Sequence, residues 1–305
     1  LTATSSIVAD EDITVSISTS GTGTEGTDYS TISDITISAG STTGTASFTP
    51  TDDSVYEGNE TGVVAISGVS GADAAESGTQ SVTITITEND SAPTITLATS
   101  ASSIAENAGS SLTLTATSSI VTDEDITVSI STSGTGTEGT DYSTISDITI
   151  SAGQTTGTAT FTPTDDSVYE GNETGIVAID SVSGADATES GTQSVTITIT
   201  ENESAPTVVL TSSASSITEN AGSSLTLTAT LSVATTADVT VGISTSGTGT
   251  EGTDYSTISD ITVSAGQTTG TATFTPTDDS VYEGNETGIV AISTVSGGSA
   301  TEDGT

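Results

Sequence analysis

The stretch Gly21–Gly40, GTGTEGTDYSTISDITISAG, returns unchanged at Gly134–Gly153. It returns again at Gly247–Gly266 with one change, Val263 in place of isoleucine. Each copy begins 113 residues after the one before, and no insertion or deletion separates them. A strict period of this length indicates a tandem array of one domain.

Within one period, seven segments alternate apolar and polar residues, which is typical of half-buried strands. In the middle copy these predicted strands are Pro93–Leu97, Leu112–Ala116, Ile126–Ser131, Ile148–Ser151, Gly157–Thr162, Gly175–Ile179 and Ser194–Thr200. Gly, Ser, Asp and Asn fill the gaps, and no stretch follows the helical period. Seven short strands per repeat have the size and rhythm of an immunoglobulin-like sandwich, although an all-β domain of another topology fits the same pattern. We therefore predict an all-β chain of tandem immunoglobulin-like antiparallel β-sandwiches, with seven strands per 113-residue repeat.

The short segments Ser91–Pro93 and Ser204–Pro206 are the predicted joints, which divides the chain into domains at 1–91, 92–204 and 205–305. Leu1 aligns with a residue inside the second strand of a copy, and Thr305 aligns just before the last strand. The first copy should therefore lack its first strand and the third its last. Either the sequence is a window on a longer array, or a neighbouring subunit donates the missing strand.

Charge is the most unusual property of the composition. The chain has 41 Asp and Glu, no Lys, Arg or His, and a formal net charge of -41. Two carboxylates about 4 Å apart repel by about 4 kcal/mol at an effective dielectric constant of about 20, and this chain has no cationic side chain to offset that repulsion. Clustered carboxylates must stay solvated, take up protons or bind metal ions.

The missing residue types exclude several functions. Without His or Cys the chain has no common nucleophile–base pair and no standard zinc site. Without Lys or Arg it has no basic face for nucleic acid, and it has no apolar run of membrane-spanning length. Acid pairs can serve glycoside hydrolysis, but the same pairs in three copies favour a structural role. We expect no enzymatic activity, no nucleic-acid partner and no membrane insertion.

An acidic run, Asp-Asp-Ser-Val-Tyr-Glu-Gly-Asn-Glu, occurs once in every copy and spans Asp165–Glu173 in the middle one. It follows a predicted strand, so it should form a loop at one end of the sandwich. Four carboxylates in nine residues suit a hard cation that takes six to eight oxygen ligands, which favours Ca²⁺ over Mg²⁺. The alternative is an acidic loop that is simply solvated.

Three features of the middle copy together resemble the Calx-beta family, the calcium-binding sandwich module of sodium–calcium exchangers and of many large bacterial surface proteins. They are Gly-Thr-Asp-Tyr at Gly139–Tyr142, the acidic run at Asp165–Glu173, and the closing strand Val195–Thr200 with Glu-Asn-Glu after it. The resemblance implies a Calx-beta-like sandwich with Ca²⁺ as its cofactor. One departure is Gly175, since the family tends to place an aromatic residue two positions after the last Glu of the run.

The resemblance also implies which residues bind calcium. In the first copy they are Asp28, Asp52, Asp53, Glu57, Glu60, Asn89 and Asp90. In the middle copy they are Glu106, Asp141, Asp165, Asp166, Glu170, Glu173, Asn202 and Glu203. In the third copy they are Glu219, Asp254, Asp278, Asp279, Glu283 and Glu286. A second acidic patch, Asp10–Asp12 and Asp123–Asp125, is replaced in the third copy by Ala234–Asp238, so we interpret it as a solvated turn.

Five asparagines begin an Asn-X-Ser/Thr triplet and are candidate glycosylation sites: Asn59, Asn89, Asn172, Asn202 and Asn285. Such triplets also arise by chance in a chain this rich in Ser and Thr, and these lie inside the predicted calcium loops.

The combined prediction is a calcium-stiffened structural spacer or filament segment of an extracellular bacterial adhesin or surface fibre. The alternative is a calcium-dependent adhesion module that binds carbohydrate or protein. The expected partners are further copies of the repeat, either in a longer array or as strand-donating neighbour subunits, and surface glycans. A need for cations in the millimolar range favours an extracellular or cell-surface location.

Overall fold

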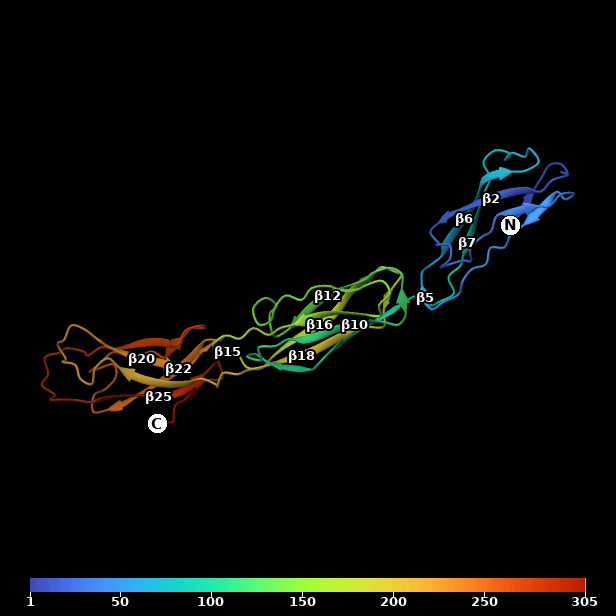
Figure 1. Ribbon diagram of the computed structural model, residues 1–305. Helices are drawn as coiled ribbons and strands as arrows, with labels where there is room; N and C mark the ends of the chain where they lie inside the picture. The colour runs from blue at the N-terminus through green and yellow to red at the C-terminus, as the bar shows by residue number, and fades with distance from the viewer. Residues whose placement is uncertain (305) are drawn as a thin grey trace.

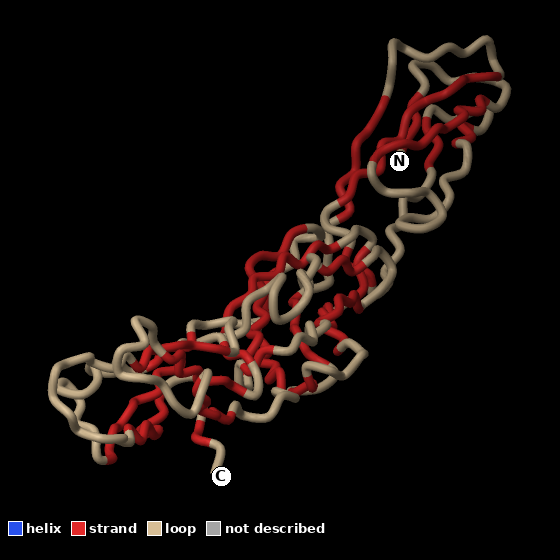
Figure 2. Tube along the Cα trace, turned by 90° about the vertical axis from the view of Figure 1, so that its left-hand side faces the viewer, coloured by secondary structure: helices blue, strands red, loops and turns tan. Residues whose placement is uncertain are grey.

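The computed structural model describes residues 1–304, which contain strands and no helix. Three β-sandwiches follow one another along an elongated molecule, with the two chain termini in the outer sandwiches (Figure 1). The view turned by 90° shows the same elongated arrangement (Figure 2). The predicted all-β, tandem-sandwich class is confirmed. Within residues 1–304, no helix has the length and apolarity needed to cross a membrane.

The middle sandwich has two sheets that face each other. The four-stranded sheet has the order β14 (Thr156–Phe161), β10 (Leu112–Ser118), β8 (Thr94–Thr99) and β17 (Thr188–Glu189). The five-stranded sheet has the order β13 (Ile148–Ile150), β12 (Ile126–Gly134), β16 (Glu173–Ser183), β18 (Ser194–Thr200) and β9 (Ser103–Ala105). All seven predicted strands are present. The extra strands β9 and β17, with β11 (Val121–Thr122) and β15 (Val168–Tyr169), are two or three residues long, too short for alternation to reveal them.

The outer sandwiches repeat this plan with fewer strands. The first has β3 (Ile35–Ile37), β2 (Ile13–Gly21), β6 (Glu60–Ser70) and β7 (Ser81–Ile86) in one sheet, opposite the pair β1 (Thr2–Thr4) and β4 (Thr43–Thr45). The third has β24 (Thr269–Phe274), β20 (Leu225–Leu231), β19 (Thr207–Ser212) and β26 (Thr301–Glu302) in one sheet, and β23 (Ile261–Val263), β22 (Val239–Gly247) and β25 (Gly288–Ser296) in the other.

The middle core is built only from residues of its own repeat, between Ile95 and Ile199. At its centre the rings of Tyr142 and Phe161 stack with their centroids 4.6 Å apart. The Phe161 ring also explains the glycine at position 175. A side-chain Cβ there would lie 2.6 Å from the ring, which is too close for any carbon contact. An aromatic side chain from the facing sheet thus occupies the space beside this backbone.

The acidic runs of the first and middle copies each connect their sandwich to the next one. In the first copy the run contains β5 (Val55–Tyr56), which pairs in parallel with β11 of the middle sandwich. In the middle copy β15 pairs in the same way with β21 (Ala234–Thr235) of the third. The run is therefore not a plain loop, because two of its residues extend a neighbouring domain.

Candidate metal centre

The repeated turn before the buried tyrosine positions one aspartate of the site. In the middle copy the Asp141 carboxylate accepts a hydrogen bond from the Thr137 N–H at 2.6 Å. Its own N–H donates to the Thr137 carbonyl at 2.9 Å, and Tyr142 beside it is buried in the core. These contacts hold Asp141 at the end of the sandwich where the acidic run also lies.

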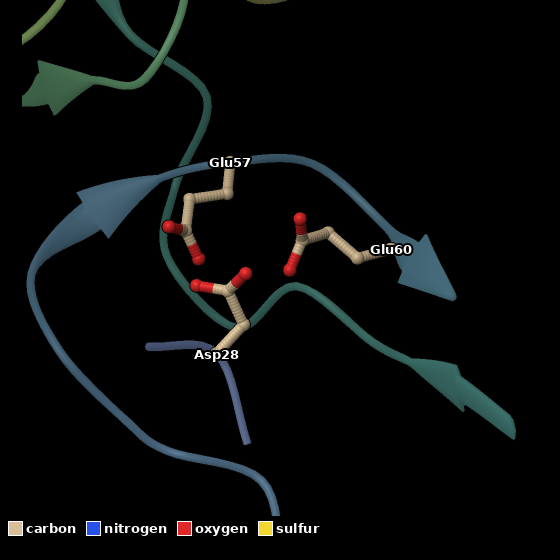
Figure 3. Close-up of side chains that lie close together, drawn as sticks. All are labelled: Asp28, Glu57 and Glu60. Carbon is tan, nitrogen blue, oxygen red and sulfur yellow. The ribbon is translucent and has the colours of Figure 1, made fainter. Parts of the chain in front are cut away.

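In every copy the acidic run brings two glutamates close to the aspartate of this turn, and the first copy shows the arrangement. Asp28, Glu57 and Glu60 each offer one carboxylate oxygen, and these oxygens all lie within 4.8 Å of one another. Figure 3 shows the three carboxylates pointing toward one another. The same arrangement recurs as Asp141, Glu170 and Glu173 in the middle copy, and as Asp254, Glu283 and Glu286 in the third. A charged triad at the same place in every copy suits one divalent cation per repeat.

A second triad lies close by in the middle copy and consists of Glu106, Glu201 and Glu203. Glu106 is only 6% exposed, and its Oε1 accepts a hydrogen bond from the Asp166 N–H at 3.3 Å. Among the described residues, the buried Oε2 of Glu203 has no hydrogen-bond partner. A buried carboxylate oxygen without a donor is costly, and a calcium ion would satisfy it. The residues present therefore fit a calcium site. In the third copy Glu219, which is equivalent to Glu106, instead forms a group with Asp279 and Glu283.

Glu201 and its counterpart Glu88 were not among the predicted ligands. Glu201 accepts four backbone N–H bonds, from Glu170, Gly171, Asn202 and Glu203. Burial opposes its ionisation, but these hydrogen bonds prevail and hold its pKa at about 2. The glutamate thus clamps the acidic run to the closing segment while offering one oxygen to the second triad. The one feature of the sequence that could have identified Glu201 is its position as the first residue of the Glu-Asn-Glu segment.

Thirteen predicted ligands fall in these triads, and eight lie outside them: Asp52, Asp53, Asn89, Asp90, Asp165, Asp166, Asn202 and Asp278. Some of the eight stabilise the loops. The Asp166 carboxylate accepts from the Val168 N–H at 2.7 Å, and the Asn89 amide donates to Asp52 at 2.9 Å. The Asn202 amide donates to Glu203 at 3.1 Å. For all the predicted residues, inside and outside the triads, the role of calcium ligand stays a prediction.

Two of the candidate glycosylation sites are tied into the same loops. The side-chain oxygen of Asn59 accepts from the Glu88 N–H at 2.9 Å, and that of Asn172 accepts from the Glu201 N–H at 3.0 Å. Glycosylation of these asparagines stays a prediction.

Four glutamates of the triads in the first two copies titrate near neutral pH in the absence of metal. Burial, followed by the charge of Asp141, raises the pKa of both Glu170 and Glu173 to about 7. Burial and Asp28 raise the pKa of Glu57 to about 7. Burial raises the pKa of Glu106 to about 7, although the hydrogen bond from the Asp166 N–H acts to lower it. A cation that binds these groups must displace protons.

The patch Asp123–Asp125 is more than the solvated turn we expected. The charge of Asp123, in the middle sandwich, contributes to the raised pKa of Glu57 in the first. Its N–H donates to the Tyr56 carbonyl at 3.4 Å. Asp125 caps a turn through the Ala152 N–H at 2.8 Å. Asp123 therefore brings negative charge from the next domain to the first triad.

Replacing Glu173 with glutamine should change two quantities, the stability of the ion-free chain and the calcium affinity of the middle site. At pH 8 the ion-free chain should become more stable by about 1–3 kcal/mol, because one charge leaves a crowded group. Calcium affinity of the middle site should fall at least about 10-fold, since a charged ligand is lost. Calorimetric titration and thermal unfolding with chelator measure the two effects.

Asp180→Asn is the matched control, because it removes the same charge from an exposed position on β16. It should change neither quantity appreciably. A glutamine variant at position 173 that binds calcium as tightly as the unmodified chain would contradict the assignment.

Known proteins are similar to this chain at the level of a domain family and of solved structures. A family model described as the Calx-beta domain matches residues 3–90, 88–203 and 201–303. Among solved structures, CBD12 from CALX1.2 matches at 19% identity, with 59% of this chain and 73% of that chain covered and a TM-score of 0.30. Invasin, a bacterial integrin-binding protein, matches at 19% identity, with 89% of this chain and 48% of that chain covered and a TM-score of 0.30. The curated proteins contain no match.

Proposed function

The chain belongs to the Calx-beta domain family, and on that premise we propose that it is a calcium-stiffened structural spacer, a filament segment of an extracellular bacterial adhesin or surface fibre. The observation that carries the proposal is the place of the triads. In the first and middle copies the acidic run holds both the triad glutamates and the two-residue strand that pairs with the next sandwich. Metal binding and domain orientation thus involve one segment.

Calcium supplies positive charge that this chain cannot supply from its own side chains. In the middle copy the residues that would hold it are Asp141, Glu170 and Glu173, with Glu106 and Glu203 beside them. Without the cation these carboxylates repel one another or share protons, which loosens the acidic run. With the cation the run is ordered, and the strand within it is held against the neighbouring domain.

The joints restrict motion because the linkers between sandwiches are short. β7 ends at Ile86 and β8 begins at Thr94, while β18 ends at Thr200 and β19 begins at Thr207. Near-identical domains joined in this way suit a role in which reach matters more than any individual surface. Calcium at extracellular concentrations would keep such an array extended.

Small-angle scattering tests the proposal on the 305-residue chain. In millimolar calcium we expect the maximum dimension of a stiff rod, and after chelation a broader distribution with a smaller mean dimension. Pairs of spin labels on introduced cysteines resolve each joint separately, since the chain has no cysteine of its own. The Asp180→Asn chain is the control for net charge. Distances that stay the same when calcium is removed would overturn the stiffening role.

The alternative function, calcium-dependent binding of carbohydrate or protein, has less support. It needs an exposed surface that distinguishes one copy from the others, and one divergent stretch is Leu231–Val241. Three of its apolar side chains, Leu231, Val239 and Val241, are buried in the third core. Binding assays with glycan arrays would separate the two functions.

A further inference from the structure

The two joints between the three sandwiches are built on the same plan. Figure 1 labels β5 at the joint of the first and middle sandwiches, and β15 at the joint of the middle and third. Each of these short strands has the sequence Val-Tyr and pairs in parallel with two residues of the following sandwich. The two joints can therefore be compared residue by residue, because equivalent positions differ by 113.

At the first joint the tyrosine of β5 is inserted into the middle sandwich. Tyr56 is only 8% exposed, and its hydroxyl donates a hydrogen bond of 2.9 Å to the Asp186 carboxylate. Its carbonyl accepts a hydrogen bond from the Asp123 N–H at 3.4 Å. Residues 182–187 line the cleft around the ring. A buried aromatic side chain with a paired hydroxyl anchors one domain to the other.

A contact within the middle sandwich holds the acceptor of this hydrogen bond in place. Asp186 lies on a left-handed turn, in which Ala185 has φ of 49° and Asp186 has φ of 50°. The Ala185 N–H donates to the Glu124 carboxylate at 3.3 Å. This bond ties the turn to the segment that pairs with β5, so the Asp186 carboxylate is presented to Tyr56 by a turn of fixed shape.

The second joint has the same backbone but lacks these side chains. The third sandwich replaces three residues of the receiving surface: Asp186 by Ser299, Glu124 by Ala237, and Val121 by Ala234. The turn keeps its left-handed shape, since Ser299 has φ of 53°. Tyr169 therefore meets no carboxylate on this turn, and Val168 pairs with an alanine that offers less apolar surface than a valine. Tyr169 is only partly buried.

The first joint also carries more negative charge than the second. The charge of Asp123, across the joint, contributes to the raised pKa of Glu57. The main charges that raise the pKa of the equivalent Glu170 belong to its own sandwich, and Thr236 stands in place of Asp123. The first joint should therefore dock best with a bound cation or in salt that screens this charge.

We propose that the hydrogen bond between Tyr56 and Asp186 locks the first joint and that the second joint is the hinge at which the array bends. The proposal deepens the spacer function, on which it rests, by giving the two joints different stiffness. Substitutions in the third sandwich, rather than the length of the linkers, set the difference.

Spin labels at equivalent positions compare the two joints directly. Thr36, Thr149 and Thr262 occupy the same exposed strand position in the three sandwiches. The pair Thr36→Cys with Thr149→Cys reports on the first joint, and Thr149→Cys with Thr262→Cys reports on the second. In millimolar calcium the distance distribution should be narrower for the first joint. The same order is expected in chelator with about 1 M NaCl, where screening within about 3 Å replaces the cation.

Exchanging the acceptor residue should exchange the behaviour of the joints. Asp186→Ser should raise the undocked fraction of the first joint about 3-fold to 10-fold, because a hydrogen bond to a charged group is lost at an exposed position. Tyr56→Phe should have a similar effect, since it removes only the donor. Ser299→Asp should narrow the distribution of the second joint.

Asp73→Ser is the matched control, because it makes the same substitution on the equivalent left-handed turn of the first sandwich, which belongs to neither of these joints. It should leave both distributions unchanged. Equal widths for the two joints in both solutions would overturn the proposal, as would a first joint that Asp186→Ser leaves unchanged. Because the comparison in chelator and salt needs no bound calcium, its result is separate from the question of whether calcium stiffens the array.

Discussion

Replacing Phe161 with alanine is expected to lower the free energy of unfolding of the middle sandwich by about 3–5 kcal/mol. The Phe161 ring is fully buried, stacks on Tyr142, and fills the space beside the backbone of Gly175. Removing it leaves a cavity between the two sheets that the β-sandwich backbone can close only in part. This side chain is among the largest fully buried ones in the molecule.

The third copy offers a matched comparison for this substitution. Phe274 makes the same stack, with Tyr255, but is only half-buried. Phe274→Ala should therefore cost distinctly less than Phe161→Ala. Denaturant-dependent hydrogen exchange assigns the loss to individual sandwiches, which a single unfolding curve cannot do in a repeat array. Equal losses of unfolding free energy for the two substitutions would show that the burial of the ring does not determine how much it stabilises its sandwich.

Calcium affinity of the middle site is expected to fall about 10-fold or more between pH 8 and pH 6. Glu106, Glu170 and Glu173 have pKa values of about 7 without metal, and a calcium ligand must be deprotonated. Each group is mostly ionised at pH 8 and mostly protonated at pH 6, so protons compete with the cation throughout this range. Titration calorimetry in buffers of different ionisation enthalpy measures the protons released on binding.

The stability of the ion-free chain should respond to pH in the opposite direction. The folded pKa of these glutamates lies above the ordinary value of 4.5, so the folded state binds more protons than the unfolded state between the two values. Their contribution to stability is complete below about pH 4.5 and is lost as the pH rises through about 7. Thermal unfolding with chelator should therefore give a higher midpoint at pH 5.5 than at pH 8. A midpoint that rises with pH, or calcium binding that releases no protons near pH 7, would contradict the clustered geometry.

The candidate site was only partly predictable from the sequence. The acidic run was visible because four carboxylates recur in nine residues, and Asp141 was implied by its place beside a repeated tyrosine. Glu201 was not predicted as part of the site, since its place there depends on four backbone N–H groups that converge on it in the folded chain. Asp123 was interpreted as solvated because nothing local indicates that it faces another domain.

The amino-acid sequence by itself determined the architecture of this protein. The 113-residue period set the domain plan, alternation located the seven main strands, and 41 acids without a basic residue required solvent, protons or metal. These are local or compositional properties, and they do not depend on which segments meet in space. Only the tertiary structure decided which carboxylates share a site and which segments of neighbouring sandwiches meet at a joint. Tyr56 reaches Asp186 across 130 residues, and burial at that meeting point, rather than any local pattern, sets the hydrogen bonds and the pKa values.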